Sequence, residues 1–505
     1  MEQVTFQSNL TQKKIILFLS GLNLMIIQFV MIRSFSAILF GTEMIILIVT
    51  ISYFFGYSIG YYLSDKLTFL ALEILSVLVL MTHLTLPFSL RYFFGFLLYH
   101  ELDFLSLVFS IFLCSFLFSF FYSLLLPKFI GEEGYDSLSR FYRLELIGGL
   151  VGIFILFLSS QFIHGNLLLM ICYLSTLTII LHLLWRSKAF LVNAIVMILL
   201  YSIMSSRMEA LSVSYFYKNS KGMKEAKHVF STHSPYQNIE VIEDRFGMRH
   251  LYLDGVRHFG GDSLSDFNYY IAGLPASLLN QPTILIVGSG SLGSLIHVLP
   301  SAKEVKTVEI DRMVIDAGLE FFGGFKDSRM DELSKKKWSL SIDDAKHFLK
   351  NSEEQYDLIV MDIAGPWQMQ VALLYTEEFY RIVSEKLKPN GMISVSLNGQ
   401  FMEESIAAGR IVKTLTAVFK DVFVVAPYND SNFAIAGNNL AFKKRDIEKM
   451  LEKNKFIRTK IYDIGEIKEE LYDHTYDMLS QEKMDIVFKR GWNRLLTDYL
   501  DIEEN

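Results

Sequence analysis

Long apolar runs in the first two fifths of the chain constrain its fold more than any other feature. A helix needs about twenty predominantly apolar residues to cross the hydrocarbon core of a bilayer. Runs of this kind lie near 15–32, 43–64, 67–90, 104–126, 144–163 and 166–185, and a shorter one lies at 189–204. The sequence therefore predicts a multi-span α-helical membrane domain over residues 1–205, with about seven spans.

The basic residues between the runs indicate an orientation. If the runs are membrane spans, eight basic residues lie at one face of the membrane and two at the other. The eight are Lys13, Lys14, Lys66, Lys128, Arg140, Arg143, Arg186 and Lys188, and the two are Arg33 and Arg91. The positive-inside rule then puts the N-terminus in the cytoplasm, and seven spans put the C-terminal half outside, away from intracellular nucleotides. An extracellular position conflicts with a domain that uses intracellular nucleotides. Three explanations stay open: the short last segment lies in the membrane interface, a span is miscounted, or the charge bias does not decide the orientation. We expect a multi-pass protein of the cell membrane with its C-terminal half in the cytoplasm.

A few residues inside the apolar runs suggest specific roles. Glu145 is expected at the membrane interface beside Arg143, whereas Glu73 either does the same or faces an internal cavity, where it could bind a cationic substrate. Gly148, Gly149 and Gly152 form a small-residue face of the kind that permits close helix packing, and we expect that role for them.

Composition excludes several other classes of protein. The net charge of −7 argues against a nucleic-acid partner, because phosphate backbones are bound by basic surfaces. The two cysteines, Cys114 and Cys172, both lie in apolar segments, so we expect buried side chains and no disulfide framework. The sequence shows no cluster of metal ligands, and no metal is expected.

A glycine-rich turn follows an apolar strand in the second half of the chain. The strand at 284–287 leads into Gly288, Gly290 and Gly293, a helical run follows, and a second strand ends at Glu309. Glycines allow a backbone to approach a ligand closely, and an acid about twenty residues further on can accept both ribose hydroxyls of an adenosine. Although the glycine pattern alone also fits an ordinary tight turn, the complete order predicts nucleotide or nucleoside binding.

Strands and helices alternate from this turn to about residue 440, which predicts an α/β Rossmann-like domain with a mostly parallel sheet over 281–440. Acids follow its second, third and fourth strands, namely Glu309, Asp344 and Asp362. Each taken singly fits a helix cap, with Asp344 the clearest case. Together they suit one nucleoside, with the ribose at Glu309, the adenine amine at Asp344 and the reacting end near Asp362.

Three further segments complete the predicted organisation. Residues 206–228 read as a polar linker, and 229–280 as a small β domain with a hairpin of 237–242 and 250–254. Residues 441–505 read as a charged, helical C-terminal tail packed on the Rossmann-like domain.

Residues 230–400 resemble the spermidine synthase family, the polyamine aminopropyltransferases. Besides the glycine loop and the acids, the matching segments, in family order, are Ser234 to Gln237, Leu253 to Gly255, Val308 to Asp311 and Leu374 to Tyr380. Such domains also occur behind multi-span membrane segments, which this chain resembles. The resemblance implies a β-rich piece followed by a class I methyltransferase-type Rossmann-like domain.

The resemblance also implies a reaction, in which an amine attacks the carbon next to the sulfonium of decarboxylated S-adenosylmethionine. Gln237 and Glu309 would hold the ribose, Asp344 the adenine, and Asp362 would be the base. Tyr269, Tyr270 and His258 occupy positions expected to contact the acceptor. The expected partners are the lipid bilayer, a small-molecule amine or membrane-embedded acceptor, and a second copy of the chain.

The chain departs from the family pattern mainly where the family holds cationic amines. Ser291 stands for an Asp, Tyr270-Ile271 for a His-Glu pair, His258 for a glutamine and Gly365 for a second Asp. Three hypotheses stay open. The chain could transfer aminopropyl groups to a polyamine or an altered acceptor, methylate a lipid or membrane substrate with intact S-adenosylmethionine, or act as a transporter or sensor that only binds the nucleoside.

Overall fold

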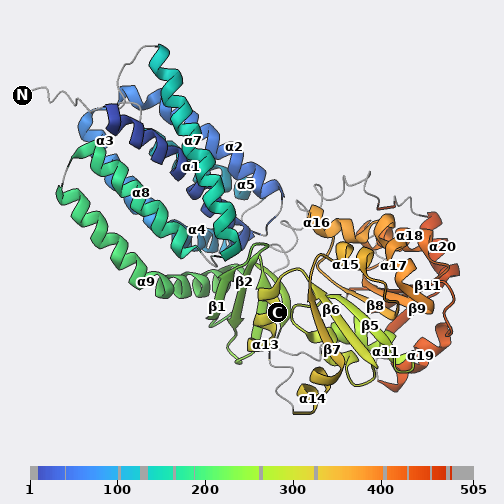
Figure 1. Cartoon of the computed structure of the whole chain (residues 1–505). Coiled ribbons are helices and arrows are strands. Elements are labelled where there is room, and N and C mark those ends of the chain that lie inside the picture. The colour runs from blue at the N-terminus through green and yellow to red at the C-terminus, as the bar shows by residue number, and fades with distance from the viewer. Residues whose placement is uncertain are drawn as a thin grey trace, which may run out of the picture. The chain divides into compact units, whose positions relative to one another are not determined.

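The computed structural model of the chain is shown in Figure 1. It describes residues 10–39, 41, 43–100, 104–125, 135–162, 166–186, 188–260, 266–322, 328–401, 406–428, 431–454, 458–473 and 478–479. The described residues divide into two compact units. The first runs to Gly247 and includes Tyr252–Val256, and the second comprises Met248–Leu251 and the described residues from Arg257 onward.

The first unit is built mainly from long apolar helices. They are α1 (Leu10–Leu39), α2 (Glu43–Leu63), α3 (Phe69–Leu84), α4 (Leu86–Tyr99), α5 (Phe104–Ser123), α7 (Tyr135–Phe162), α8 (Leu167–Trp185) and α9 (Lys188–Ser220). Within the described residues, seven stretches are long and apolar enough to cross a membrane, with α3 and α4 counted as one. Their number and positions agree with the runs predicted from the sequence.

The last helix is longer than predicted. α9 continues to Ser220, so the expectation of a linker is wrong for residues 206–220. Val213, Phe216 and Tyr217 are buried there, at helical spacing, among more polar neighbours. Burial of these side chains extends the helix through a segment whose composition is that of a linker.

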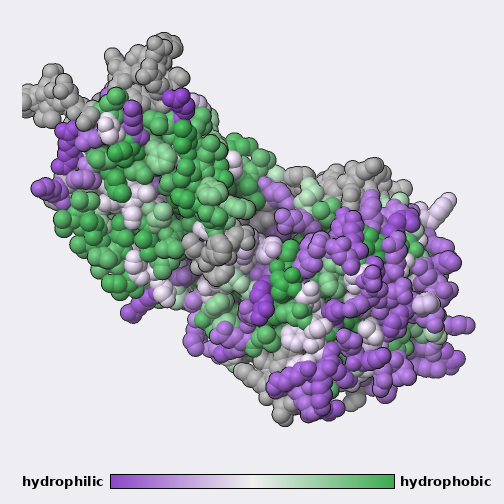
Figure 2. All heavy atoms as spheres, viewed as in Figure 1, coloured by the Kyte–Doolittle hydropathy of each residue, from purple (hydrophilic) through white to green (hydrophobic). Residues whose placement is uncertain are grey.

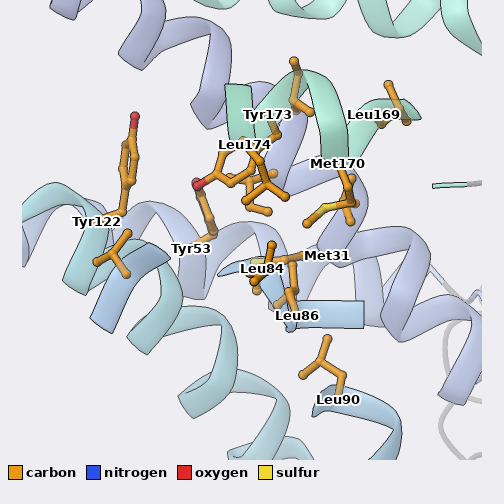
Figure 3. Packing of buried hydrophobic residues seen from close by; sticks show 14 of the residues in the cluster. Met31, Tyr53, Leu84, Leu86, Leu90, Tyr122, Leu169, Met170, Tyr173 and Leu174 are labelled. Atoms are coloured by element: carbon orange, nitrogen blue, oxygen red, sulfur yellow. The ribbon is translucent and has the colours of Figure 1, made fainter. Parts of the chain in front are cut away.

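Apolar and aromatic side chains fill the helical core, as Figure 3 shows for Tyr53, Tyr122, Tyr173 and their neighbours. Glycines let α1 and α7 approach closely, because a Cβ at Gly148 would overlap the carbonyl oxygen of Phe18. The predicted packing role of the small residues in α7 is thereby confirmed for Gly148.

The two acids singled out in the apolar runs have different surroundings. The Glu145 carboxylate accepts hydrogen bonds from the hydroxyls of Tyr57 and Tyr61, at 2.6 and 2.8 Å. Glu73 is exposed on α3, so the hypothesis that it faces an internal cavity is wrong.

The ends of the bundle can be assigned from two contacts within the first unit. Arg186 Nη2, just after α8, donates to Gln12 Oε1 at 2.9 Å, so α9 begins at the end of the bundle where α1 begins. At the other end, a Cβ on Gly255 would lie 2.9 Å from the carbonyl oxygen of Ala37, near the end of α1. The chain therefore enters the bundle at one end and leaves it, after α9, at the opposite end.

A four-stranded sheet follows α9, in the order β1-β2-β3-β4. The strands are β1 (Lys227–His233), β2 (Asn238–Glu243), β3 (Arg249–Leu253) and β4 (Val256–Gly260). The predicted hairpin segments correspond to β2 and β3. Asp254 and Gly255 join β3 to β4 with positive φ at both positions, which is the geometry of a two-residue hairpin turn.

The second unit contains an eight-stranded sheet in the order β12-β10-β11-β9-β8-β5-β6-β7. The strands are β5 (Thr283–Gly288), β6 (Glu304–Glu309), β7 (Trp338–Ile342), β8 (Tyr356–Asp362), β9 (Leu387–Ser396), β10 (Asp421–Pro427), β11 (Phe433–Gly437) and β12 (Thr459–Tyr462). Strands β5 to β9 pair in parallel, and β10, β11 and β12 add antiparallel strands at one edge. The predicted doubly wound sheet is confirmed in its parallel part.

Helices connect the strands of this sheet. They include α12 (Gly293–Val298), α13 (Arg312–Phe321), α14 (Ser328–Lys337), α15 (Ala345–Asn351), α17 (Glu377–Lys386) and α18 (Ile406–Val418), with α10 (Asp266–Asn268), a π-helix (Tyr269–Gly273) and α11 (Leu274–Ser277) before β5. The predicted helical tail begins with α19 (Lys444–Lys453), but β12 then pairs with β10 before α20 (Ile464–Asp473). Residues 441–473 therefore include part of the sheet, and residues 480–505 lie outside the described residues.

Candidate functional site

The strand order of the second sheet reverses between β5 and β8. From β5 the chain moves to β6 and β7 on one side, then returns to β8 and β9 on the other. In open α/β sheets, ligands bind outside the carboxyl ends of the strands at such a switch point. The predicted residues lie at these ends, in the spatial order Asp362, Gly288, Glu309 and then Asp344 just after β7.

The glycine loop is closely packed against protein atoms. Gly288 has φ +87°, a backbone conformation that other residues rarely adopt, and a Cβ there would overlap the Asp362 carbonyl oxygen. A Cβ on Gly290 would overlap Val314, and one on Gly293 would overlap the Asn268 side chain. Packing thus accounts for all three glycines, and their predicted approach to a ligand stays a prediction.

Glu309 ends β6 and is partly buried. Its Oε1 accepts a hydrogen bond from the backbone N–H of Asp311 at 3.1 Å. Burial raises the pKa of Glu309 to about 7; the Asp311 N–H partly opposes this shift, while the nearby charges of Asp311 and Asp362 add to it. The Glu309 side chain therefore changes charge near neutral pH. Hydrogen-bond donors on a ligand would favour its ionised form.

Asp362 ends β8 across β5 from Glu309. Its Oδ2 accepts a hydrogen bond from Ser294 Oγ at 2.6 Å, and its backbone oxygen accepts one from Ser289 N at 2.8 Å. Burial raises the pKa of the Asp362 carboxyl, while the hydroxyls of Ser294 and Ser289 act in the opposite direction. A carboxylate that is more basic than usual, yet fixed in place by a hydroxyl, suits proton acceptance.

Asp344 is an exposed residue at the N-terminus of α15. Its Oδ1 accepts a hydrogen bond from His347 N at 2.9 Å, which is the capping role that fits this acid taken singly. Next to it, the Asp343 N–H donates to the Glu309 carbonyl oxygen at 3.1 Å, linking the two strand ends. The contact of Asp344 with adenine stays a prediction.

The residues predicted to contact the acceptor have other partners. The Tyr270 hydroxyl lies 2.6 Å from Thr459 Oγ1, and its ring stacks on Phe433 in the core. The Tyr269 hydroxyl accepts a hydrogen bond from Asn454 Nδ2 at 2.9 Å. These contacts hold both tyrosines in place, and their contact with the acceptor stays a prediction.

Two predicted residues lie in the β1–β4 region. His258 is exposed on β4. Gln237 belongs to the first unit, in the turn between β1 and β2, where its N–H donates to Ser234 Oγ at 3.0 Å. The acceptor role of His258 and the ribose contact of Gln237 both stay predictions.

Sequence reasoning missed Ser294 and Asn268. Ser294 donates to Asp362, and its Oγ also lies 3.4 Å from Asn268 Oδ1. Both residues are almost fully buried. The one sequence signal for Ser294 was its place directly after Gly293, in the first turn of α12 and next to the switch point. Among the described residues, no group of three His, Cys, Asp or Glu side chains could hold a metal ion.

The parallel strands and their connecting helices define a Rossmann-like domain, with Glu309 and Asp362 at the carboxyl ends of β6 and β8. A family described as "Spermine/spermidine synthase domain" matches residues 266–434. The polyamine aminopropyltransferase of Nitrosomonas europaea is 30% identical over 255 residues, which cover 46% of this chain and 74% of that protein. The chain therefore belongs to the polyamine aminopropyltransferase family, whose members are transferase enzymes.

Other relatives are matched over shorter stretches. The polyamine aminopropyltransferase of Leptospira biflexa is 31% identical over 171 residues, 33% of this chain and 59% of that protein. The spermine synthase of Arabidopsis thaliana is 30% identical over 201 residues, 37% of this chain and 54% of that protein. The solved spermidine synthase from Thermotoga maritima is 18% identical, with a TM-score of 0.37, covering 55% of this chain and 87% of that one.

Proposed function

We propose that this chain transfers an aminopropyl group from decarboxylated S-adenosylmethionine to an amine. The observation that carries the proposal is the pair of partly buried acids with raised pKa values, Glu309 and Asp362, at the ends of the two strands flanking β5. Membership of the aminopropyltransferase family supports the choice of donor. The donor is a substrate, and no metal is part of the proposal.

In the proposed reaction, the nitrogen lone pair of the acceptor attacks the aminopropyl carbon bound to the sulfonium. The carbon–sulfur bond breaks, its electron pair goes to sulfur, and methylthioadenosine leaves. The new secondary ammonium loses its proton to Asp362, whose raised pKa makes the carboxylate a better acceptor than an exposed Asp. The protein contributes mainly the in-line alignment of the two reactants.

The roles at the donor follow the order of the strand ends. Glu309 would accept both ribose hydroxyls, and Asp344, beyond it, would accept from the adenine amine. This arrangement leaves Asp362, on the other side of β5, next to the sulfonium.

The acceptor would be a polyamine or an amine of different shape. The family's carboxylates for cationic amines are replaced here by Ser291, Ile271 and Gly365. A partly buried ammonium needs such partners, so we propose that this site holds its acceptor with fewer charged contacts than its relatives do.

Restoring one carboxylate tests this view of the acceptor. We expect Ser291→Asp to lower the KM for a diamine about tenfold, because a charge-assisted contact is regained. Ser291→Asn, which matches the shape without the charge, is the control and should leave the KM unchanged. Steady-state rates over a range of 1,4-diaminobutane concentrations measure both variants. Equal KM values for the Asp variant and the wild type would remove Ser291 from the account.

Product analysis tests the proposed reaction itself. The full-length protein is incubated with decarboxylated or intact S-adenosylmethionine and a mixture of amines, and the nucleoside products are identified by mass spectrometry. We expect methylthioadenosine from the decarboxylated donor, with one alkylated amine for each molecule released. Formation of S-adenosylhomocysteine would assign the chain to the methyltransferases, and binding without turnover would assign it to the transporters or sensors.

We also propose that the helical part of the first unit crosses the cell membrane. Figure 2 shows hydrophobic side chains over the visible face of these helices, whereas hydrophilic ones predominate on the second unit. Large apolar side chains are exposed on several helices, including Ile51 at 56%, Phe109 at 62% and Ile203 at 78%. Exposed apolar surface of this extent is unfavourable in water and favourable in contact with the hydrocarbon chains of lipids.

The orientation of the helices in the membrane decides on which side the catalytic domain lies. We propose that the catalytic domain lies in the cytoplasm, where the nucleoside donor is. Because the chain leaves the bundle opposite its entry, the N-terminal end and its basic residues would then lie outside, against the positive-inside rule. Fusions of the C-terminus to a green fluorescent protein and to alkaline phosphatase separate the two orientations. Fluorescence without phosphatase activity is the expected result, and the reverse would place the catalytic domain outside.

A further inference from the structure

A cavity of about 190 Å³ lies within the first unit, and the proposed reaction makes no use of it. Residues of α1, α4 and α9, the start of α8, and strand β1 line it. Among the lining residues are a cationic and an acidic side chain from the helices, Arg91 and Glu209, and His233 from the end of β1. A liquid water molecule occupies about 30 Å³, so the cavity has room for a small organic group.

The positive charge at this cavity is already neutralised. Arg91 Nη2 lies 2.6 Å from Glu240 Oε1, and both side chains are almost fully buried. The hydroxyls of Tyr217 and Ser231 donate to Glu240 at 2.7 and 3.2 Å. Arg91 and Glu240 therefore form a satisfied pair, and the guanidinium has little charge left to attract an anion.

Glu209 is a second carboxylate beside the same cation. Its Oε1 lies 3.7 Å from Arg91 Nη1, longer than a hydrogen bond, and its side chain is 36% exposed. One guanidinium thus faces two carboxylates, and of these two only Glu209 lines the cavity.

Two buried atoms in the cavity wall have no hydrogen-bond partner among the described residues, Asn166 Oδ1 and His233 Nε2. His233 is only 5% exposed. Burial, with Arg33 and Arg91 nearby, holds the pKa of His233 well below its ordinary value, so the ring is neutral and a nitrogen can accept a hydrogen bond. An unpaired amide oxygen in a buried wall likewise needs a donor.

We propose that this cavity binds a primary ammonium group. An ammonium carries one positive charge and three donors, which match the carboxylate of Glu209, the amide oxygen of Asn166 and the neutral ring of His233. The ammonium belongs either to a free small amine or to the headgroup of an amine-bearing lipid. The site is separate from the acids of the β5–β8 edge and does not depend on the reaction proposed for them.

A photoreactive diamine locates the site directly. The full-length protein in phosphatidylcholine nanodiscs is irradiated with a diamine that carries a diazirine, and the labelled peptides are mapped by mass spectrometry. We expect label on residues 201–209 or 227–233. Excess 1,4-diaminobutane should remove that label, and Glu209→Gln should lower it at least about tenfold, because the charged partner is lost.

Two variants control for folding and for charge. Glu73→Gln makes the same change at an exposed carboxylate of the helical bundle that does not line the cavity, and should label as the wild type does. Glu209→Asp keeps the charge and should retain more label than Glu209→Gln. If Glu209→Gln labels like the wild type, or if an excess of succinate displaces the probe as well as the diamine does, the proposal fails.

Replacing part of the phosphatidylcholine by phosphatidylethanolamine identifies the source of the ammonium. If the lipid abolishes labelling at the cavity, its headgroup occupies the site, and if labelling persists, the site takes free amines. Methylthioadenosine release, measured on the same samples, reports on the β5–β8 edge alone, so failure at one site is distinguishable from failure at the other.

Discussion

Replacing Asp362 by Asn is expected to lower kcat by about 10²- to 10⁴-fold, the range of a lost general base. The amide keeps the shape of the side chain and can still contact Ser294, but it cannot take the proton of the alkylated amine. Donor affinity should change little, because the ribose and adenine contacts are assigned to other residues. Steady-state kinetics give kcat, and equilibrium binding of methylthioadenosine gives the affinity.

Asp357→Asn is the matched control for that prediction. Asp357 lies on the same strand, β8, at the end away from the site, where its Oδ2 accepts from Lys388 Nζ at 2.7 Å. The same oxygen accepts a hydrogen bond from Thr283 N at 2.8 Å, which the amide oxygen of Asn can keep, so losing the partly exposed ion pair costs about 1 kcal/mol of stability. A wild-type kcat in the Asp362 variant, or an equal loss in both variants, would exclude Asp362 as the base.

Replacing Glu309 by Gln is expected to weaken donor binding about 10- to 150-fold, since hydrogen bonds to a charged acceptor are worth roughly 1.5–3 kcal/mol. The wild type should also bind more tightly as pH rises. Its Glu309 is mostly protonated below its pKa of about 7 and ionised above it, and the ionised form accepts both ribose hydroxyls. Affinity should therefore increase about tenfold between about pH 6 and 8 in the wild type, and not in the Gln variant.

A ligand control isolates the ribose contact. Methylthioadenosine should show this pH dependence, and its 2′,3′-dideoxy analogue should not, because it lacks the hydroxyls. Calorimetric titration at several pH values measures both. An analogue that binds as tightly as methylthioadenosine, with the same pH profile, would show that Glu309 does not hold the ribose.

The raised pKa also predicts a change in stability with pH. Ionising a buried Glu is unfavourable, so the stability that its protonated form provides is fully present below the ordinary Glu pKa. It is lost as pH rises through about 7 in the ligand-free protein, and the Gln variant should lack this loss.

The placement of the acids was predictable from the sequence because it depends on a general property of parallel sheets. The carboxyl ends of parallel strands meet at one edge, so Glu309 and Asp362 had to lie near each other once their strands were recognised. The sequence did not show that β5 lies between them, which follows from the strand order. It also did not show that protein atoms lie close against the three glycines.

Segments with weak periodicity could not be predicted. β12 is four residues long, Thr459–Tyr462, and becomes a strand only because β10 offers it an edge. In α9, the residues after 205 have the composition of a linker, and burial of Phe216 and Tyr217 keeps them helical. In both cases tertiary contacts outweigh the local signal.

Contacts between side chains that lie far apart in the chain could not be predicted from the sequence either. Arg91 and Glu240 are 149 positions apart, and nothing in either segment indicates the other. The partnership of Ser294 with Asp362, 68 positions apart, is similar. Arg91 of the first pair lines the cavity of the first unit, and Ser294 of the second contacts the proposed base, so both features depend on the folded chain.

The most direct test of the account is an experimental structure of the full-length protein with bound methylthioadenosine. We predict that the nucleoside lies across the ends of β5 and β6, with both ribose hydroxyls donating to the Glu309 carboxylate and its sulfur on the side of Asp362. A nucleoside bound elsewhere, or found there with both carboxylates turned away from it, would contradict the account.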